Sequence, residues 1–105
     1  MIITTTETVA GREILNNYGL VRGNTIRARH LGKDILAVFR MLVGGEIGEY
    51  TKLMAESREQ ALDRMKEEAK RLGANGIVSV RFATSMISKG AAEILVFGTA
   101  VTLSE

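Results

Sequence analysis

The stretch YTKLMAESREQALDRMKEEAKRLGANG, residues 50–76, carries the strongest structural signal in the chain. Its apolar side chains recur at steps of three and four residues, which is typical of an amphipathic helix with one stripe against a core; they are Tyr50, Leu53, Met54, Ala61, Leu62, Met65, Ala69 and Leu72. Gly73 can supply the left-handed conformation at which many helices end, and Asn75-Gly76 predicts a tight turn. The stretch therefore predicts a long helix that turns directly into a strand.

The segments that follow the turn predict two strands. Residues 77–87 read IVSVRFATSMI, and their alternation predicts one side that packs on the helix; it holds Val78, Val80, Phe82, Thr84 and Met86. Residues 93–103 read EILVFGTAVTL and are apolar on both sides. Because large apolar surfaces are rarely left open, we expect contacts between subunits through the sheet.

The segments before the long helix predict two more strands and a short helix. Residues 1–6, MIITTT, are rich in β-branched side chains, as strands are. For residues 14–30 we favour one long bent strand over two strands joined by a turn. Residues 34–43 predict a short helix that Gly44 and Gly45 end. The chain, residues 1–105, is thus expected to be one α+β domain, with a long helix on a mainly antiparallel sheet.

Composition narrows the classes of protein. The 105 residues contain no cysteine, which excludes disulfides and thiolate metal sites. Their net charge is +2. The first residues lack the pattern of a signal peptide, and no apolar stretch approaches the ~20 residues that cross a bilayer. We expect a cytoplasmic protein that has no membrane partner.

The catalytic residues of common enzymes are missing from the sequence. His30 is the one histidine, and no nucleophile motif of the G-x-S-x-G type is present. No base, nucleophile and electrophile can be assembled, so we do not expect an enzyme. Carboxylates remain as ligands for a hard cation if symmetry brings copies together, or as ordinary surface acids; they are Glu13, Glu46, Glu49 and Glu93.

Two groups of charged residues have both a structural and a functional interpretation. Arg58 lies on the predicted apolar stripe, where a buried charge needs a partner. It is either part of an ion pair with a glutamate such as Glu46 or a clamp for an anion. The basic positions Arg22, Arg27 and Arg29 could follow a phosphate backbone, but their stretch holds one aromatic residue, Tyr18, which argues against nucleic-acid binding.

Several motifs in this order make the chain resemble the YbjQ family of small bacterial and archaeal proteins. The motifs are GLVRG at 19–23, KDILAVFRMLVGGE at 33–46, LGAN at 72–75 and GTAV at 98–101, with Tyr50, Arg58, Ala61, Arg81 and Glu93 between them. The resemblance implies a β-rich α+β subunit that assembles into a pentameric ring, and a heavy-metal-binding description. Without cysteine, a metal would need the methionines or a ring of symmetry copies as ligands. The chain also has Phe97 where family members commonly have tyrosine.

The combined interpretation is a non-enzymatic homopentamer that binds a small anion, a polar molecule or a metal ion near a subunit interface. The positions expected to hold the ligand are Arg40, Glu46, Tyr50, Arg58 and Arg81. An alternative is a purely structural or protein-interaction ring without a ligand. A third is weak nucleic-acid binding through Arg22, Arg27 and Arg29. The metal and any cofactor are left unidentified.

Overall fold

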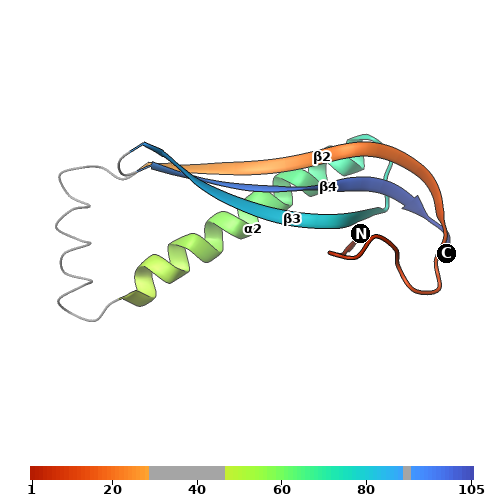
Figure 1. The fold of residues 1–105 in the computed structure, drawn as a ribbon, viewed down its shortest axis with the longest axis horizontal. Coiled ribbons are helices and arrows are strands. Elements are labelled where there is room, and N and C mark those ends of the chain that lie inside the picture. The colour runs from red at the N-terminus through yellow and green to blue at the C-terminus, as the bar shows by residue number, and fades with distance from the viewer. Residues whose placement is uncertain (29–46, 89–90) are drawn as a thin grey trace.

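The computed structural model describes residues 1–28, 47–88 and 91–105 (Figure 1). In chain order these residues form strands β1 (Ile2–Ile3) and β2 (Ile14–Ala28), helix α2 (Ile47–Arg71), and strands β3 (Gly76–Ser88) and β4 (Ala91–Leu103). The strands lie in the order β1-β3-β4-β2, with β1 parallel to β3 and the other pairs antiparallel. The predicted class is confirmed for this part of the chain: a helix on a mixed, mainly antiparallel sheet. The helix predicted at residues 34–43 lies outside the described residues.

Helix α2 ends as its sequence predicts. The N–H of Gly73 donates to the carbonyl of Lys70 at 3.0 Å, and the N–H of Ala74 donates to Ala69 at 3.1 Å. Gly73 has a φ of 89°, so this pair of bonds is a Schellman ending with glycine in the left-handed position. The C-terminal turn is thereby fixed, and the chain enters β3 within a few residues.

Asn75 links that turn to the C-terminal end of β4. Its side-chain amide donates to the carbonyl of Leu103 at 3.0 Å and accepts from the N–H of Leu103 at 2.7 Å. Its backbone N–H donates to Val101 at 3.1 Å. One side chain thus imitates a strand residue opposite Leu103, which holds the start of β3 against the end of β4.

Strand β2 is one long strand, as predicted. Its pairing with β4 shifts between Ile14 and Asn16 and again between Asn17 and Gly19, and Gly19 has a φ of 90°. The glycine accommodates the irregularity that bends the strand. Further along, Gly23 lies directly under α2, where a Cβ atom would collide with the carbonyl of Ala61 and lie 2.5 Å from the backbone nitrogen of Met65.

Strand β3 departs from the predicted alternation. Its register with β4 shifts between Val78 and Arg81, and Ser79 has a positive φ of 54°. This bulge moves Val78 to the face away from the helix, whereas Val80 packs in the core beneath α2. The prediction that Val78 and Val80 share a side is therefore wrong, because one extra residue reverses the phase of the strand.

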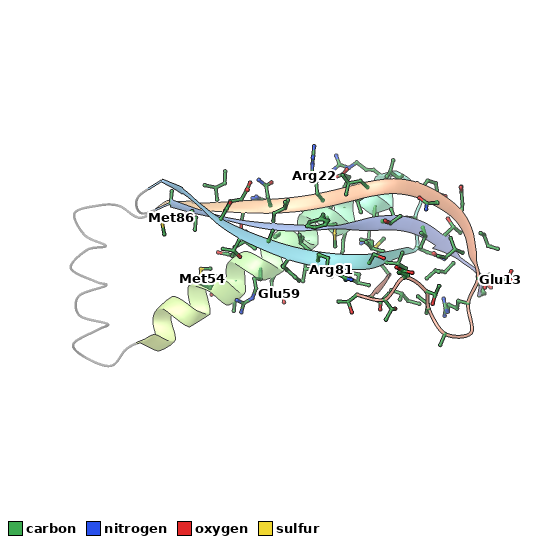
Figure 2. All side chains as sticks on the ribbon, in the orientation of Figure 1. Glu13, Arg22, Met54, Glu59, Arg81 and Met86 are labelled. Atoms are coloured by element: carbon green, nitrogen blue, oxygen red, sulfur yellow. The ribbon has the colours of Figure 1, made fainter. Side chains whose placement is uncertain are left out.

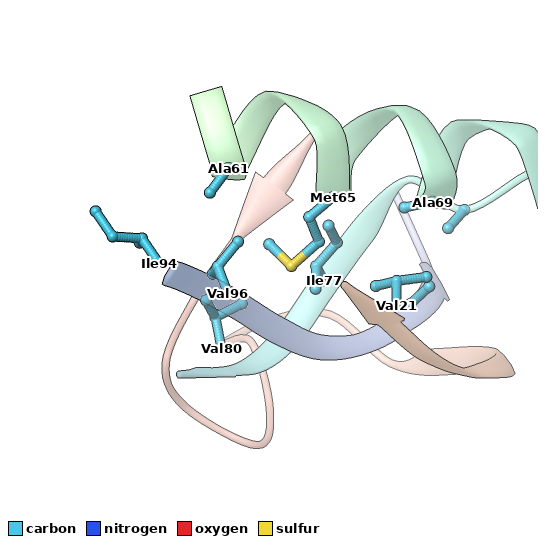
Figure 3. Close-up of a cluster of buried hydrophobic side chains, with 10 residues drawn as sticks. Val21, Ala61, Met65, Ala69, Ile77, Val80, Ile94 and Val96 are labelled. Atoms are coloured by element: carbon cyan, nitrogen blue, oxygen red, sulfur yellow. The ribbon is translucent and has the colours of Figure 1, made fainter. Parts of the chain in front are cut away.

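The main core lies between α2 and one face of the sheet (Figure 3). Met65 and Ala61 from the helix meet Val21, Ile77 and Val96 from three strands, and all five are 0% exposed. A smaller cluster on the opposite face packs Val78, Val101 and Leu103 against Ile2 and Val9 of the N-terminal segment. Both faces of β4 are thus apolar, as its sequence predicts. Among the residues that the structure describes, no helix is long and apolar enough to span a membrane.

Candidate functional site

Among the described residues, only the N-terminal segment covers the face of the sheet opposite α2. It packs on Val78, Val101 and Leu103, at the end of the sheet near the termini. Beyond it Leu20 and Ile26 are 62% and 58% exposed, and Leu95 and Phe97 are half-buried. We call this the open face; its described members are Leu20, Arg22, Asn24 and Ile26 of β2, Glu93, Leu95, Phe97 and Thr99 of β4, and Arg81, Ala83 and Ser85 of β3.

The pairing registers place these side chains in rows across the three strands. Phe97 lies opposite Arg22 on one side and opposite Arg81 on the other. Directly opposite residues in an antiparallel pair point to the same face. The open face therefore carries one aromatic side chain between two arginines, and Figure 2 shows both arginines about halfway along the length of the strands.

Arg81 is attached to the N-terminal segment. Its Nη1 donates to the carbonyl of Thr5 and to that of Val80, each at 2.8 Å. The side chain remains exposed. Since both bonds use the same nitrogen, Nε and Nη2 are directed to other acceptors or to solvent. Arg81, which the sequence predicts as a ligand-binding residue, thus has a structural contact and free donors at once.

The outer edge of β2 is closed by side chains of α2. Glu68 accepts from the backbone N–H of Arg22 at 3.4 Å, and Arg64 donates to the carbonyl of Asn24. The Asn24 side chain in turn donates to Glu93 at 3.0 Å. These bonds occupy backbone groups that another strand would need for pairing, so this part of the edge is protected.

Of the predicted ligand-binding cluster, the structure describes the side chains of Arg58 and Arg81, and these two lie in different layers. Arg81 lies on the open face, whereas Arg58 lies on α2, in the other layer, and is exposed. The prediction that Arg58 is a buried charge in need of a partner is wrong, because the buried position of that turn is Ser57, at 0% exposure. Arg40 and Glu46 lie outside the described residues, and so does the side chain of Tyr50.

The described residues do not fit a heavy-metal site. Within residues 1–28, 47–88 and 91–105, no group of three histidine, cysteine, aspartate or glutamate side chains could hold a metal ion. Of the methionines, Met65 is fully buried in the core, and Met86 is 80% exposed. Met54, which is partly buried, lies on α2 (Figure 2). A metal would therefore need ligands from His30 and its neighbours or from other copies of the chain.

Sequence reasoning missed the aromatic position of the open face. The stretch around Arg22 contains one aromatic residue, Tyr18, whose hydroxyl is paired with Thr102 at 2.9 Å. Phe97 stands far away in the sequence and joins Arg22 only through the pairing of β2 with β4. Only the register, which single-sequence patterns do not specify, reveals the combination.

In the part of the chain that the structure describes, the fold is that of a small α+β protein with one helical layer on a curved sheet. A solved structure from Pediococcus pentosaceus, titled as a protein of unknown function from the DUF74 family, has this fold; it superposes with a TM-score of 0.69 at 18% identity and covers 99% of this chain and 98% of that one.

Sequence comparison identifies the family more specifically than the fold does. The YbjQ family model, described as "Putative heavy-metal-binding", matches residues 1–104. A UPF0145 protein of Methanosarcina acetivorans is 55% identical over 103 residues, covering 98% of this chain and 97% of the relative. Another UPF0145 protein, from Archaeoglobus fulgidus, is 57% identical over 103 residues, covering 98% and 95%. The chain belongs to the YbjQ family, whose curated relatives carry the name UPF0145.

Proposed function

We propose that the chain is the non-enzymatic subunit of a homopentameric ring that binds a small anion or polar molecule near a subunit interface. The observation that carries this proposal is the open face, where Leu20 and Ile26 are more than half exposed beside half-buried Leu95 and Phe97. Apolar surface of this kind on one face of a sheet usually marks a contact with another molecule. The family resemblance supplies the expectation of a pentamer.

The protected edge of β2 favours contacts between subunits through the face of the sheet over contacts through its edges. The helix residues Arg64 and Glu68 occupy outward backbone groups of β2, and Thr4 and Thr6 occupy those of Val80 and Ser79 on β3. Strands with occupied edges do not add a further strand readily. In the described part of the chain, the open face therefore offers uncovered apolar side chains at Leu20 and Ile26.

Native mass spectrometry of the purified protein tests assembly and binding together. We expect a mass of five chains, with an additional mass where a ligand is retained. Leu20→Glu should place a charge in the interface and shift the population toward monomers. The matched control is Leu72→Glu, because Leu72 is a 44% exposed leucine at the end of α2. A monomeric natural protein, or equal behaviour of the two variants, would contradict assembly through this face.

A purely structural ring is the second candidate, and the bonds from Arg81 to the Thr5 and Val80 carbonyls favour it. In that case the arginine only fastens the N-terminal segment. A ligand raises the free energy of unfolding by about 2.7 kcal/mol at a hundred times its Kd. The test is a panel of anions, metabolites and metal ions added to a ring that carries no retained ligand. If none of them changes the melting temperature, the purely structural ring is supported over the binding protein.

A further inference from the structure

The outer edge of β3 is protected along only part of its length. Val80 is the last residue whose outward groups are occupied: its N–H donates to the carbonyl of Thr4 at 3.0 Å, and its carbonyl accepts from Nη1 of Arg81 at 2.8 Å. Residues 81–86 are all exposed. Within residues 1–28, 47–88 and 91–105, no hydrogen bond closes this edge beyond Val80. The later part of β3 is therefore an uncovered strand edge in the described structure.

The backbone groups of Phe82, Thr84 and Met86 point away from β4 along this edge. Val80 directs its N–H outward, toward the N-terminal segment. The pairing with β4 then runs without a shift from Arg81 to Met86. Successive strand residues direct their N–H and C=O groups to opposite neighbours, so every second residue after Val80 repeats its outward direction. Three residues therefore offer both a donor and an acceptor to a further strand.

The side chains of these three residues lie on the same side of the sheet as α2. Phe82 is opposite Val96 of the main core, and side chains two positions apart on a strand share a face. Phe82 is nevertheless 48% exposed, and Met86, near the end of β3 in Figure 2, is 80% exposed. Residues 82–88 read FATSMIS and contain no charge and no proline, which are the usual means of keeping strand edges apart. This edge therefore has the features of a contact with another strand.

We propose that the outer edge of β3 pairs with the same edge of a second copy of the chain, antiparallel, about a two-fold axis through Thr84. In this register Thr84 lies opposite its own copy, and Phe82 and Met86 lie opposite each other in both directions. Apolar pairs and threonine pairs across neighbouring strands stabilise antiparallel sheets. The residues with outward backbone groups would exchange about six hydrogen bonds.

The limits of the free edge select this register. An axis through Phe82 would place Val80 opposite Thr84, although the backbone of Val80 is already bonded to Thr4 and Arg81. An axis through Met86 would place Phe82 opposite position 90, beyond the end of β3 at Ser88. Only the axis through Thr84 uses the three outward residues together and keeps the pairing within the free part of the strand.

The contact lies outside the proposed ring and goes beyond it. Arg64 and Glu68 occupy outward groups of β2, so the free edge of β3 finds its partner, among the described strands, in another β3. Two identical edges meet through a two-fold axis, which does not relate neighbours in a ring of five. The pairing therefore joins two rings and leaves the open face for the contact within each ring. A short strand pair buries little area, so we expect reversible, concentration-dependent association.

Sedimentation velocity over a range of protein concentrations tests the pairing. We expect five chains at low concentration and ten at high concentration. Leu20→Glu, which should separate the ring, leaves β3 unchanged and should pass from one chain to two. A natural protein that passes from one chain to two would refute the ring and support the strand pairing. A ring that never doubles, or a doubling that Leu20→Glu removes, would overturn the strand pairing and leave the ring.

Exchange of charges across the axis tests the register. Phe82→Lys should raise the Kd of the doubling by about 10-fold or more, because it places an unpaired charge against Met86 of the second copy. Met86→Glu should do the same against Phe82. The double variant should restore a doubling that weakens with salt, because the two introduced charges then lie opposite each other. At the axis itself, a mixture of Thr84→Lys and Thr84→Glu should associate, whereas neither variant should associate alone.

Leu72→Lys is the matched control, because Leu72 is 44% exposed at the end of α2, close to the 48% of Phe82. It should leave the doubling unchanged. Equal weakening by Leu72→Lys and Phe82→Lys would overturn the contact. Failure of both charge exchanges to restore doubling, in variants that melt at the temperature of Phe82→Lys, would overturn the register. Binding of an extended peptide along β3 without any doubling would also overturn the proposal, in favour of a different protein partner.

Discussion

The close approach of α2 to β2 at Gly23 yields a sharp prediction for Gly23→Ala. The added methyl group would collide with the carbonyl of Ala61 and lie 2.5 Å from the backbone nitrogen of Met65. Both blocking groups are helix backbone, so no rotamer change can move them aside, and α2 must shift away from the sheet. Ala61 and Met65 are both 0% exposed, and this shift would loosen their packing in the main core.

The cost should reach the upper end of the range for overpacked cores, about 3 kcal/mol. In a domain of this size each kcal/mol lowers the melting temperature by about 4–8 °C, so we expect a fall of about 12–24 °C. Thermal unfolding followed by circular dichroism at one fixed protein concentration measures it, because assembly makes the midpoint depend on concentration.

Gly19→Ala on the same strand separates steric collision from backbone strain. Gly19 has a φ of 90°, and an added Cβ there meets nothing within 4 Å. Its expected cost is that of the left-handed conformation alone, about 1–2 kcal/mol. If Gly23→Ala destabilises the protein no more than Gly19→Ala, the reasoning from close helix packing is refuted.

Three further substitutions test the bulge, the turn and the protected edge. Ser79→Gly should raise the free energy of unfolding by about 0.5–1 kcal/mol in urea unfolding, since a residue at a φ of 54° is strained unless it is glycine; lower stability would mean that the serine side chain outweighs the strain. Asn75→Ala should cost about 1–3 kcal/mol in the same assay, because it removes both bonds to Leu103. Arg64→Ala should uncover the Asn24 carbonyl and increase aggregation in light scattering, with unchanged scattering as the contrary result.

The sequence predicts those parts of the fold that depend on local physics. The 3.6-residue period predicts α2, and Gly73 predicts its end, because helix packing and helix termination are both decided within a few turns. The strand from Ile14 to Ala28 follows from β propensity in the same way. Two apolar faces on β4 were also predictable, since strict alternation of side chains is a local property.

The features that the sequence does not predict depend on the pairing of strands that are distant in the chain. The bulge at Ser79 reverses the faces of β3, although no glycine or proline marks it in the sequence. The sequence pattern puts Arg58 on the apolar stripe because a four-residue step reaches it from Met54, yet the buried position of that turn is Ser57. An error of one position on a helix is about 100° of rotation, enough to exchange core for solvent.

The same long-range pairing bears on the sequence argument about nucleic-acid binding. A basic stretch with few aromatic residues nearby argues against stacking when the sequence is considered alone. Folding places Phe97 between Arg22 and Arg81, so the aromatic group comes from β4 and one charge comes from β3. Such a row, perpendicular to the strands, has no fixed spacing in sequence. The open face therefore brings together an aromatic side chain and two charges that no single segment of the chain contains.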